Sequence, residues 1–69
     1  MNWSHVVSSN LDAVAYDAAS STLYIRFKSS GTYAYYGVPQ SVYNGLMSAG
    51  SHGEYHAVHI KNSYRYQRL

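Results

Sequence analysis

The residues from position 22 to 28 alternate between polar and apolar side chains, and this pattern constrains the fold more than any other feature of the chain. Every second position is apolar, namely Leu23, Ile25 and Phe27. The positions between them carry Tyr24, Arg26 and Lys28. Such alternation is typical of an antiparallel sheet with one face on a core and one face in water. The chain therefore predicts a sheet that needs a cover on one side only.

Three further segments extend this sheet. Residues 13–17 and 32–36 are β-prone, and the tail from residue 62 to 69 alternates tyrosine with arginine as a last strand would. Short loops separate the first two segments from the central strand, which favours antiparallel neighbours.

Two helices follow the β-prone segment at residues 32–36. Pro39 begins a helix that ends at Ala49, because proline suits the first helical turn and Gly50 is a natural stop. Ser51 and Glu54 have the spacing of a capping box, which predicts a short second helix over residues 52–59. We expect an α+β fold, with a small antiparallel sheet of three to four strands and both helices packed on one face.

The loop Ser29-Ser30-Gly31 decides which way the next two tyrosines point. With a three-residue loop and Gly31 in the left-handed conformation, Phe27 faces Tyr33, Ile25 faces Tyr35, and both tyrosines join the core. A two-residue loop would turn both toward Arg26 and Lys28 on the outer face. Glycine at the third position favours the core, although both registers stay open. The expected core is Val14, Leu23, Ile25, Phe27, Tyr33, Tyr35, Val38, Val42, Leu46 and Ile60.

Length and composition limit the class of protein. With 69 residues and no cysteine, the chain forms one domain, residues 1–69, without a disulfide or a thiolate metal site. No apolar stretch approaches the roughly 18 residues of a membrane span. We therefore expect a cytoplasmic protein that does not enter a membrane.

Cations and tyrosines alternate in the tail, a pattern typical of proteins that bind single-stranded nucleic acid. The predicted nucleic-acid-binding residues are Arg26, Lys28, Lys61, Tyr64, Arg65, Tyr66 and Arg68. If the tail paired beside the strand that carries Arg26, all the basic residues would share one surface. The alternative is a terminal strand with inward tyrosines and solvated arginines.

Protein association is the second functional hypothesis. Nine of the 69 residues are tyrosine, a residue that is enriched at interfaces. Tyr24, Tyr36 and Tyr43 would form an exposed aromatic patch, and an unpaired sheet edge would extend across a homodimer.

Metal binding and catalysis have less support. His52, His56 and His59 have helical spacing that can place imidazoles around zinc, but the only carboxylate nearby, Glu54, belongs to the helix cap. Metal-free ribonuclease chemistry would use His56, His59 and Lys61. No catalytic triad or carboxylate pair accompanies them, so we expect neither a metal nor another cofactor, and no enzyme.

A series of short motifs runs through the chain in fixed order from about residue 6. They are Ser8-Ser9-Asn10-Leu11, Tyr16-Asp17, Leu23-x-Ile25-x-Phe27, Gly31-x-Tyr33-x-Tyr35, Gly37-Val38-Pro39, Val42-Tyr43, Ser48-Ala49-Gly50-Ser51-x-Gly53-x-Tyr55, Ile60-Lys61 and Tyr64-x-Tyr66. In this order the chain resembles the KTSC domain family, which occurs at the C-terminus of some lysyl-tRNA synthetases and as small free-standing bacterial proteins.

The resemblance implies a family without an established activity, for which that association suggests RNA binding. The chain departs from the family after Tyr55, where His56-Ala57 replace the usual phenylalanine and asparagine. A role of that asparagine in a ligand site or a turn is therefore not transferred to Ala57. We expect a non-catalytic module that binds RNA or another single-stranded nucleic acid.

Overall fold

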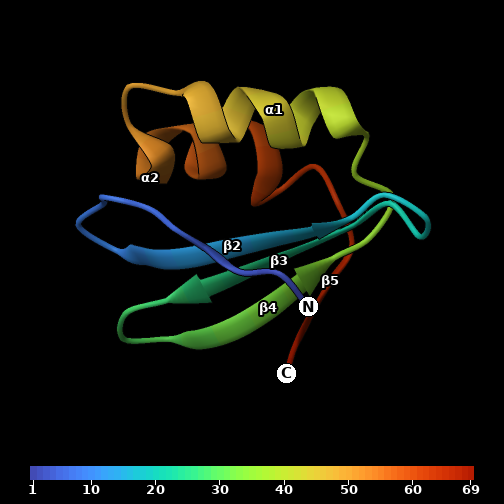
Figure 1. Ribbon diagram of the computed structural model, residues 1–69, viewed down its shortest axis with the longest axis horizontal. Helices are drawn as coiled ribbons and strands as arrows, with labels where there is room; N and C mark the ends of the chain where they lie inside the picture. Colours follow the sequence, from blue (N-terminus) through green and yellow to red (C-terminus); the bar gives the residue numbers. More distant parts are fainter.

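An antiparallel sheet forms one layer of the protein and the helices form the other (Figure 1). The computed structural model describes residues 1–69, and its five strands lie in sequence order, so that each pairs with the next. They are β1 (Ser4–His5), β2 (Leu11–Asp17), β3 (Thr22–Phe27), β4 (Gly31–Tyr35) and β5 (Tyr66–Arg68). The α+β prediction is confirmed, but three to four strands was too few, because the two-residue β1 is too short to show an alternation.

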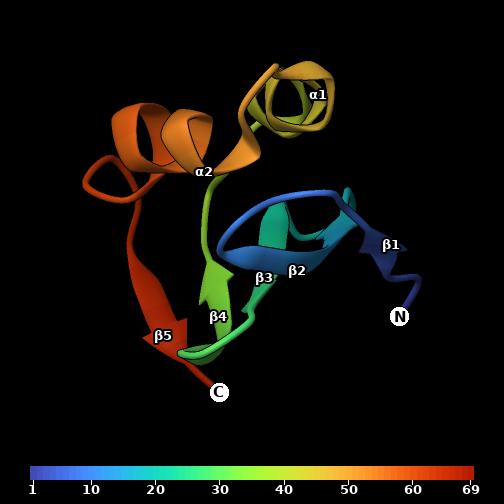
Figure 2. The same ribbon diagram turned by 90° about the vertical axis from the view of Figure 1, so that its left-hand side faces the viewer.

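The helical layer covers one face of the sheet, as the second view shows (Figure 2). It consists of α1 (Gln40–Ser48), α2 (His52–Tyr55) and a π-helical turn, η1 (His56–Ile60), which continues α2. The predicted cap is present, because the backbone N–H of Glu54 donates to the Ser51 hydroxyl at 3.2 Å. None of these helices has both the length and the apolar character that a membrane span requires.

The hairpin between β3 and β4 places the tyrosines of β4 on the core face. Gly31 has φ of 90°, the left-handed conformation that its place in the loop predicts. However, Ile25 pairs with Tyr33 and Leu23 with Tyr35, whereas we expected partners two residues further along β3. The predicted pairs were wrong because Gly31 already belongs to β4, opposite Phe27. A shift of two residues keeps every side chain on its face, so the core orientation is confirmed.

A β-bulge in β2 supplies a core residue that the alternation pattern did not predict. The register shifts between Leu11, which pairs with Phe27, and Ala13, which pairs with Arg26. In a regular strand, residues 11 and 14 would point to opposite faces. The extra residue at Asp12 lets both Leu11 and Val14 turn inward, and both are fully buried.

The core lies between the sheet and the helices. Its buried members are Leu11, Val14, Leu23, Ile25, Tyr35, Val38, Leu46 and Ile60. Three expected members, Phe27, Tyr33 and Val42, are only half-buried and pack against it from the side. The first two lie where the core opens toward β5, and this opening becomes important for the site.

Gly45 allows α1 and α2 to pack closely. A Cβ at this position would clash with the ring of Tyr55, whose Cζ would lie 2.7 Å away. Glycine costs about 1 kcal/mol in a helix relative to alanine. The packing of the Tyr55 ring against the backbone of α1 explains why that cost is accepted here.

We expect Gly45→Ala to lower the free energy of unfolding by about 1–3 kcal/mol, because overpacking outweighs the gain in helix propensity. In a Tyr55→Leu background the same change should raise it by about 1 kcal/mol. Urea unfolding of the four proteins measures this coupling. Gly50→Ala is the control, since a Cβ there meets nothing within 4 Å. A stabilising Gly45→Ala in the wild-type background would contradict the packing.

Candidate binding cleft

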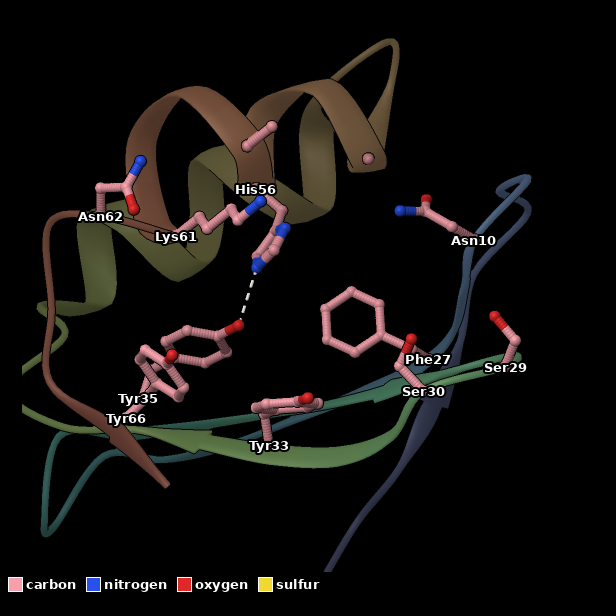
Figure 3. Close-up of a pocket in the computed structure, with 12 residues that line it drawn as sticks. Asn10, Phe27, Ser29, Ser30, Tyr33, Tyr35, His56, Lys61, Asn62 and Tyr66 are labelled. Atoms are coloured by element: carbon pink, nitrogen blue, oxygen red, sulfur yellow. Dashed lines mark hydrogen bonds between the residues drawn. The ribbon is translucent and has the colours of Figure 1, made fainter. Parts of the chain in front are cut away.

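A cleft of about 410 Å³ opens between η1 and the part of the sheet formed by β4 and β5 (Figure 3). Its aromatic lining consists of Phe27, Tyr33, Tyr35, His56 and Tyr66. Its polar lining includes Asn10, Ser29, Ser30, Lys61 and Asn62. The volume lies within the range of small-molecule sites, and the mixture of rings with a few polar groups is typical of them.

The sheet register brings three tyrosines together. Alternation along β4 puts Tyr33 and Tyr35 on one face, and β5 pairs with β4 so that Tyr66 lies opposite Tyr35. The ring centroid of Tyr66 is 5.9 Å from that of Tyr33 and 5.8 Å from that of Tyr35. Tyr66 is 59% exposed, so it forms an accessible wall, whereas Tyr35 is only 4% exposed and lies at the floor.

His56 reaches down from η1 to complete the floor. Its Nε2 atom lies 2.8 Å from the Tyr35 hydroxyl, and Phe27 meets the imidazole edge-on with ring centroids 5.1 Å apart (Figure 3). The side chain is 7% exposed. Strand and helix are therefore joined across the cleft by one hydrogen bond between two buried polar groups.

The direction of the contact between Tyr35 and His56 depends on the histidine tautomer. In the tautomer in which the Tyr35 hydroxyl donates to Nε2, neutral His56 carries its proton on Nδ1. The Nδ1 atom of His56 has no hydrogen-bond partner in the protein. Because every buried side-chain nitrogen and oxygen does have a partner, Nδ1 is not buried and is accessible to solvent. In that tautomer, the floor of the cleft offers a ligand one uncharged N–H donor.

Burial keeps both members of this pair uncharged. Desolvation, with a smaller contribution from the positive charge of Lys61, lowers the pKa of His56 below its usual 6.5. Burial raises the pKa of Tyr35 to about 12, assisted by the neighbouring Tyr33 and Tyr66. At neutral pH the floor is polar but uncharged, and the charge of the cleft belongs to Lys61 at its rim.

Three of the predicted nucleic-acid-binding residues lie on the side of the molecule that carries this cleft. Lys61 and Tyr66 line it. Arg68 pairs with Tyr33 and so leaves the sheet on the same face, and its guanidinium nitrogen Nη2 lies 3.4 Å from the Cβ position of Gly31. Two cations and the exposed Tyr66 ring therefore share one side of the molecule.

The other four lie elsewhere. Arg26 is on the opposite face of the sheet, where its Nε donates to Asp12 at 3.0 Å and its guanidinium stacks 4.8 Å from the ring of Trp3. Lys28 is exposed just after β3. Tyr64 packs against the core, and Arg65 is exposed beside β4. The tail pairs with β4 rather than β3, so the basic residues do not form a single surface.

The three histidines considered as zinc ligands do not form a cluster. His52 Nδ1 lies 2.8 Å from the carbonyl oxygen of Leu46, and the His59 ring packs on Tyr55 with centroids 4.4 Å apart. Only His56 of the three lines the aromatic cleft. No group of three or more histidine, aspartate or glutamate side chains is arranged to hold a metal ion. The π-helical turn changes the spacing between His56 and His59 on which the zinc hypothesis partly depended.

The predicted aromatic patch is also divided. Tyr43 is half-buried and stacks on Tyr16 with centroids 4.9 Å apart, so it serves the fold. Tyr36 donates its hydroxyl to Gln67 at 2.9 Å. Tyr24 lies between Ala15 and Ala34 of the neighbouring strands.

The sequence did not predict several of the cleft residues. It indicated His56 only for metal binding or nuclease chemistry, and Asn10, Ser29 and Ser30 only as parts of turns or motifs. Asn62 belonged to a predicted strand. No periodicity connects these positions, because three loops and the π-helical turn meet here. The departure from the family at His56 was the one available signal.

These features define a small α+β domain with an aromatic cleft between its sheet and its second helix. The sequence profile of the KTSC domain matches residues 7–64, and the chain belongs to the KTSC domain family. The resemblance inferred from the motifs is thus confirmed.

Two relatives support this assignment. A protein of Tsukamurella paurometabola is 42% identical over 50 residues, which cover 72% of this chain and 75% of that protein. The crystal structure of a KTSC domain protein from Yersinia pestis superposes with a TM-score of 0.97 at 32% identity, and the match covers 99% of this chain and 96% of that one.

The buried state of His56 predicts a dependence of stability on pH. Because folding lowers the pKa of His56, the unfolded chain binds the proton more tightly, and the free energy of unfolding should fall as the pH drops through 6.5. His56→Phe should remove this contribution. Urea unfolding between about pH 8 and pH 5 measures it. The matched control is His59→Gln, at an exposed position, which should keep the wild-type slope. An unchanged slope in His56→Phe would contradict a buried neutral imidazole.

Proposed function

We propose that this domain binds single-stranded RNA, with one base in the aromatic cleft and neighbouring phosphates at Lys61 and Arg68. The observation that carries the proposal is the meeting of stacking rings, an uncharged donor and two cations on one face of the molecule. This combination matches the parts of a nucleotide, which join a flat heteroaromatic ring to an anionic backbone.

The walls of the cleft suit a planar ring. Tyr66 is 59% exposed, and Phe27 and Tyr33, both on the sheet, form an edge-to-face pair with ring centroids 5.6 Å apart. Stacking of a base on an aromatic side chain contributes about 1–3 kcal/mol and tolerates any base. We therefore assign Tyr66 as the principal stacking residue.

The floor suits the edge of a base rather than a phosphate. The Nδ1–H of His56 can donate to a carbonyl oxygen or an unprotonated ring nitrogen, and every base offers such an acceptor. A phosphate there would have to shed water beside an uncharged pair, which is costly. At the rim, the Lys61 ammonium group remains available to the backbone.

A base inside a duplex cannot enter such a cleft, because its edges are paired and its faces are stacked. Sequence-dependent RNA binding generally uses unstacked bases in loops and ends for this reason. The proposed ligand is therefore single-stranded rather than duplex RNA.

The proposal is one of binding without catalysis. Metal-free cleavage of RNA needs an acid and a base within reach of the same phosphate. Of the four histidines, His56 alone lines the aromatic cleft, and its Nε2 is engaged by a tyrosine whose pKa is about 12. Neither group is well placed to exchange protons with a phosphate at the rim.

The test is fluorescence-anisotropy titration of labelled single-stranded and duplex RNA and DNA at about 50 and 200 mM salt. We expect salt-sensitive binding of the single strands. Tyr66→Ala should weaken it by about 1–3 kcal/mol at either salt concentration. The double variant Lys61→Ala/Arg68→Ala should reduce the slope of log K against log salt by about 0.7 for each phosphate that it no longer neutralises.

Arg65→Ala is the matched control for charge, because Arg65 is exposed and does not line the cleft. It should change the affinity little. If Arg65→Ala lost as much affinity as the single Lys61→Ala or Arg68→Ala variant, the binding would be nonspecific electrostatic attraction and the assignment of Lys61 and Arg68 would be wrong. No binding at low salt would refute the proposal and favour the alternative of a protein partner or self-association, to be tested by light scattering.

A further inference from the structure

A second cleft adjoins the aromatic one and differs from it in chemistry. It has a volume of about 570 Å³ and is lined by nine residues, only two of them hydrophobic. Its polar lining includes His5, Ser9, Lys28 and His52. It contains no aromatic ring of tyrosine, phenylalanine or tryptophan, so it cannot stack a base as the first cleft can.

The two clefts share a narrow wall. Asn10 and Gly53 line the first cleft, and their chain neighbours Ser9 and His52 line the second. The side chain of Asn10 lies so close to Gly53 that a Cβ there would be 2.6 Å from its Oδ1 atom. A flexible chain that leaves one cleft across this wall enters the other.

Lys28 stands at the same boundary. Its backbone N–H donates to the carbonyl oxygen of Asn10 at 2.9 Å, which ties the end of β3 to the wall. The next residue, Ser29, lines the aromatic cleft, whereas Lys28 lines the second. The hairpin thus places the Lys28 side chain in the second cleft, directly beside the aromatic cleft.

The charge of the second cleft is set by Lys28. Its only carboxylate, Asp12, forms an ion pair with the guanidinium of Arg26 at 3.0 Å. This ion pair partly offsets the negative charge of Asp12, which would otherwise repel an anion. A cation with hydroxyl and imidazole groups remains, a set that suits a phosphate.

We propose that this second cleft is a phosphate subsite, which binds the sugar-phosphate backbone of a nucleotide adjacent to the one whose base occupies the aromatic cleft. The inference rests on the proposed function, because it describes the path that the bound RNA strand takes after it leaves the aromatic cleft. Its ligand class is a phosphodiester. Binding should therefore grow with strand length beyond a single nucleotide.

The test compares uridine monophosphate with octauridylate by NMR titration of the isotope-labelled protein. Octauridylate should shift the amide signals of Ser9 and His52 in addition to those around the aromatic cleft, whereas the mononucleotide should shift only the latter. Lys28→Ala should weaken octauridylate several-fold and lower its salt slope by about 0.7, and should leave the mononucleotide unchanged.

Arg65→Ala is again the control, because it removes the same charge and lines neither cleft. If octauridylate binds but Lys28→Ala behaves like Arg65→Ala, the second subsite is wrong and the first cleft stands. If neither ligand binds the wild-type protein at low salt, both the subsite and the proposed function are overturned. If both variants and both ligands behave as expected, the strand runs across the Asn10 wall.

Discussion

The register of the hairpin between β3 and β4 is the constraint on which the rest of the structure depends. Gly31, at φ of 90°, sets the end of the turn so that Ile25 meets Tyr33 and Leu23 meets Tyr35. A slip of one residue would carry the tyrosines of β4 to the outer face and leave the helices without a partner surface. Because β5 pairs with β4, the same register also places Tyr66 beside Tyr35. The core and the cleft thus share one determinant.

The cleft exists because the helical layer covers the sheet incompletely. Leu46 of α1 and Ile60 of η1 are buried in the core, whereas β5 is an edge strand whose residues are all exposed. Between these regions, the hydrogen bond from Tyr35 to His56 closes the floor at 2.8 Å. A polar pair at this depth stabilises the fold only while both groups remain uncharged and bonded to each other. The uncharged, hydrogen-bonded state of His56 that stabilises the fold is therefore also the state that the proposed binding uses.

The sequence predicted those parts of the fold that repeat with a period and missed those that break one. Alternation from Leu23 to Phe27 identified the central strand and its core face, and the Ser51 cap identified the second helix. The bulge at Asp12 and the π-helical turn at residues 56–60 each add a residue to a regular element, which no periodic pattern reports. The first brought Leu11 into the core, and the second changed the spacing between His56 and His59.

The candidate site was predicted by composition but not by position. Alternation of cations with tyrosines pointed to the tail, and Lys61, Tyr66 and Arg68 lie on the cleft face. The same pattern could not indicate that Arg26 would pair with Asp12 on the other side of the sheet, because that contact depends on the β2 register. Yet this ion pair gives Arg26 an electrostatic part in the proposed site. Among the residues lining the second cleft, Lys28 is the only lysine or arginine, and the only carboxylate, Asp12, is paired with Arg26. Arg26 would then act on an anion through Asp12, without touching it.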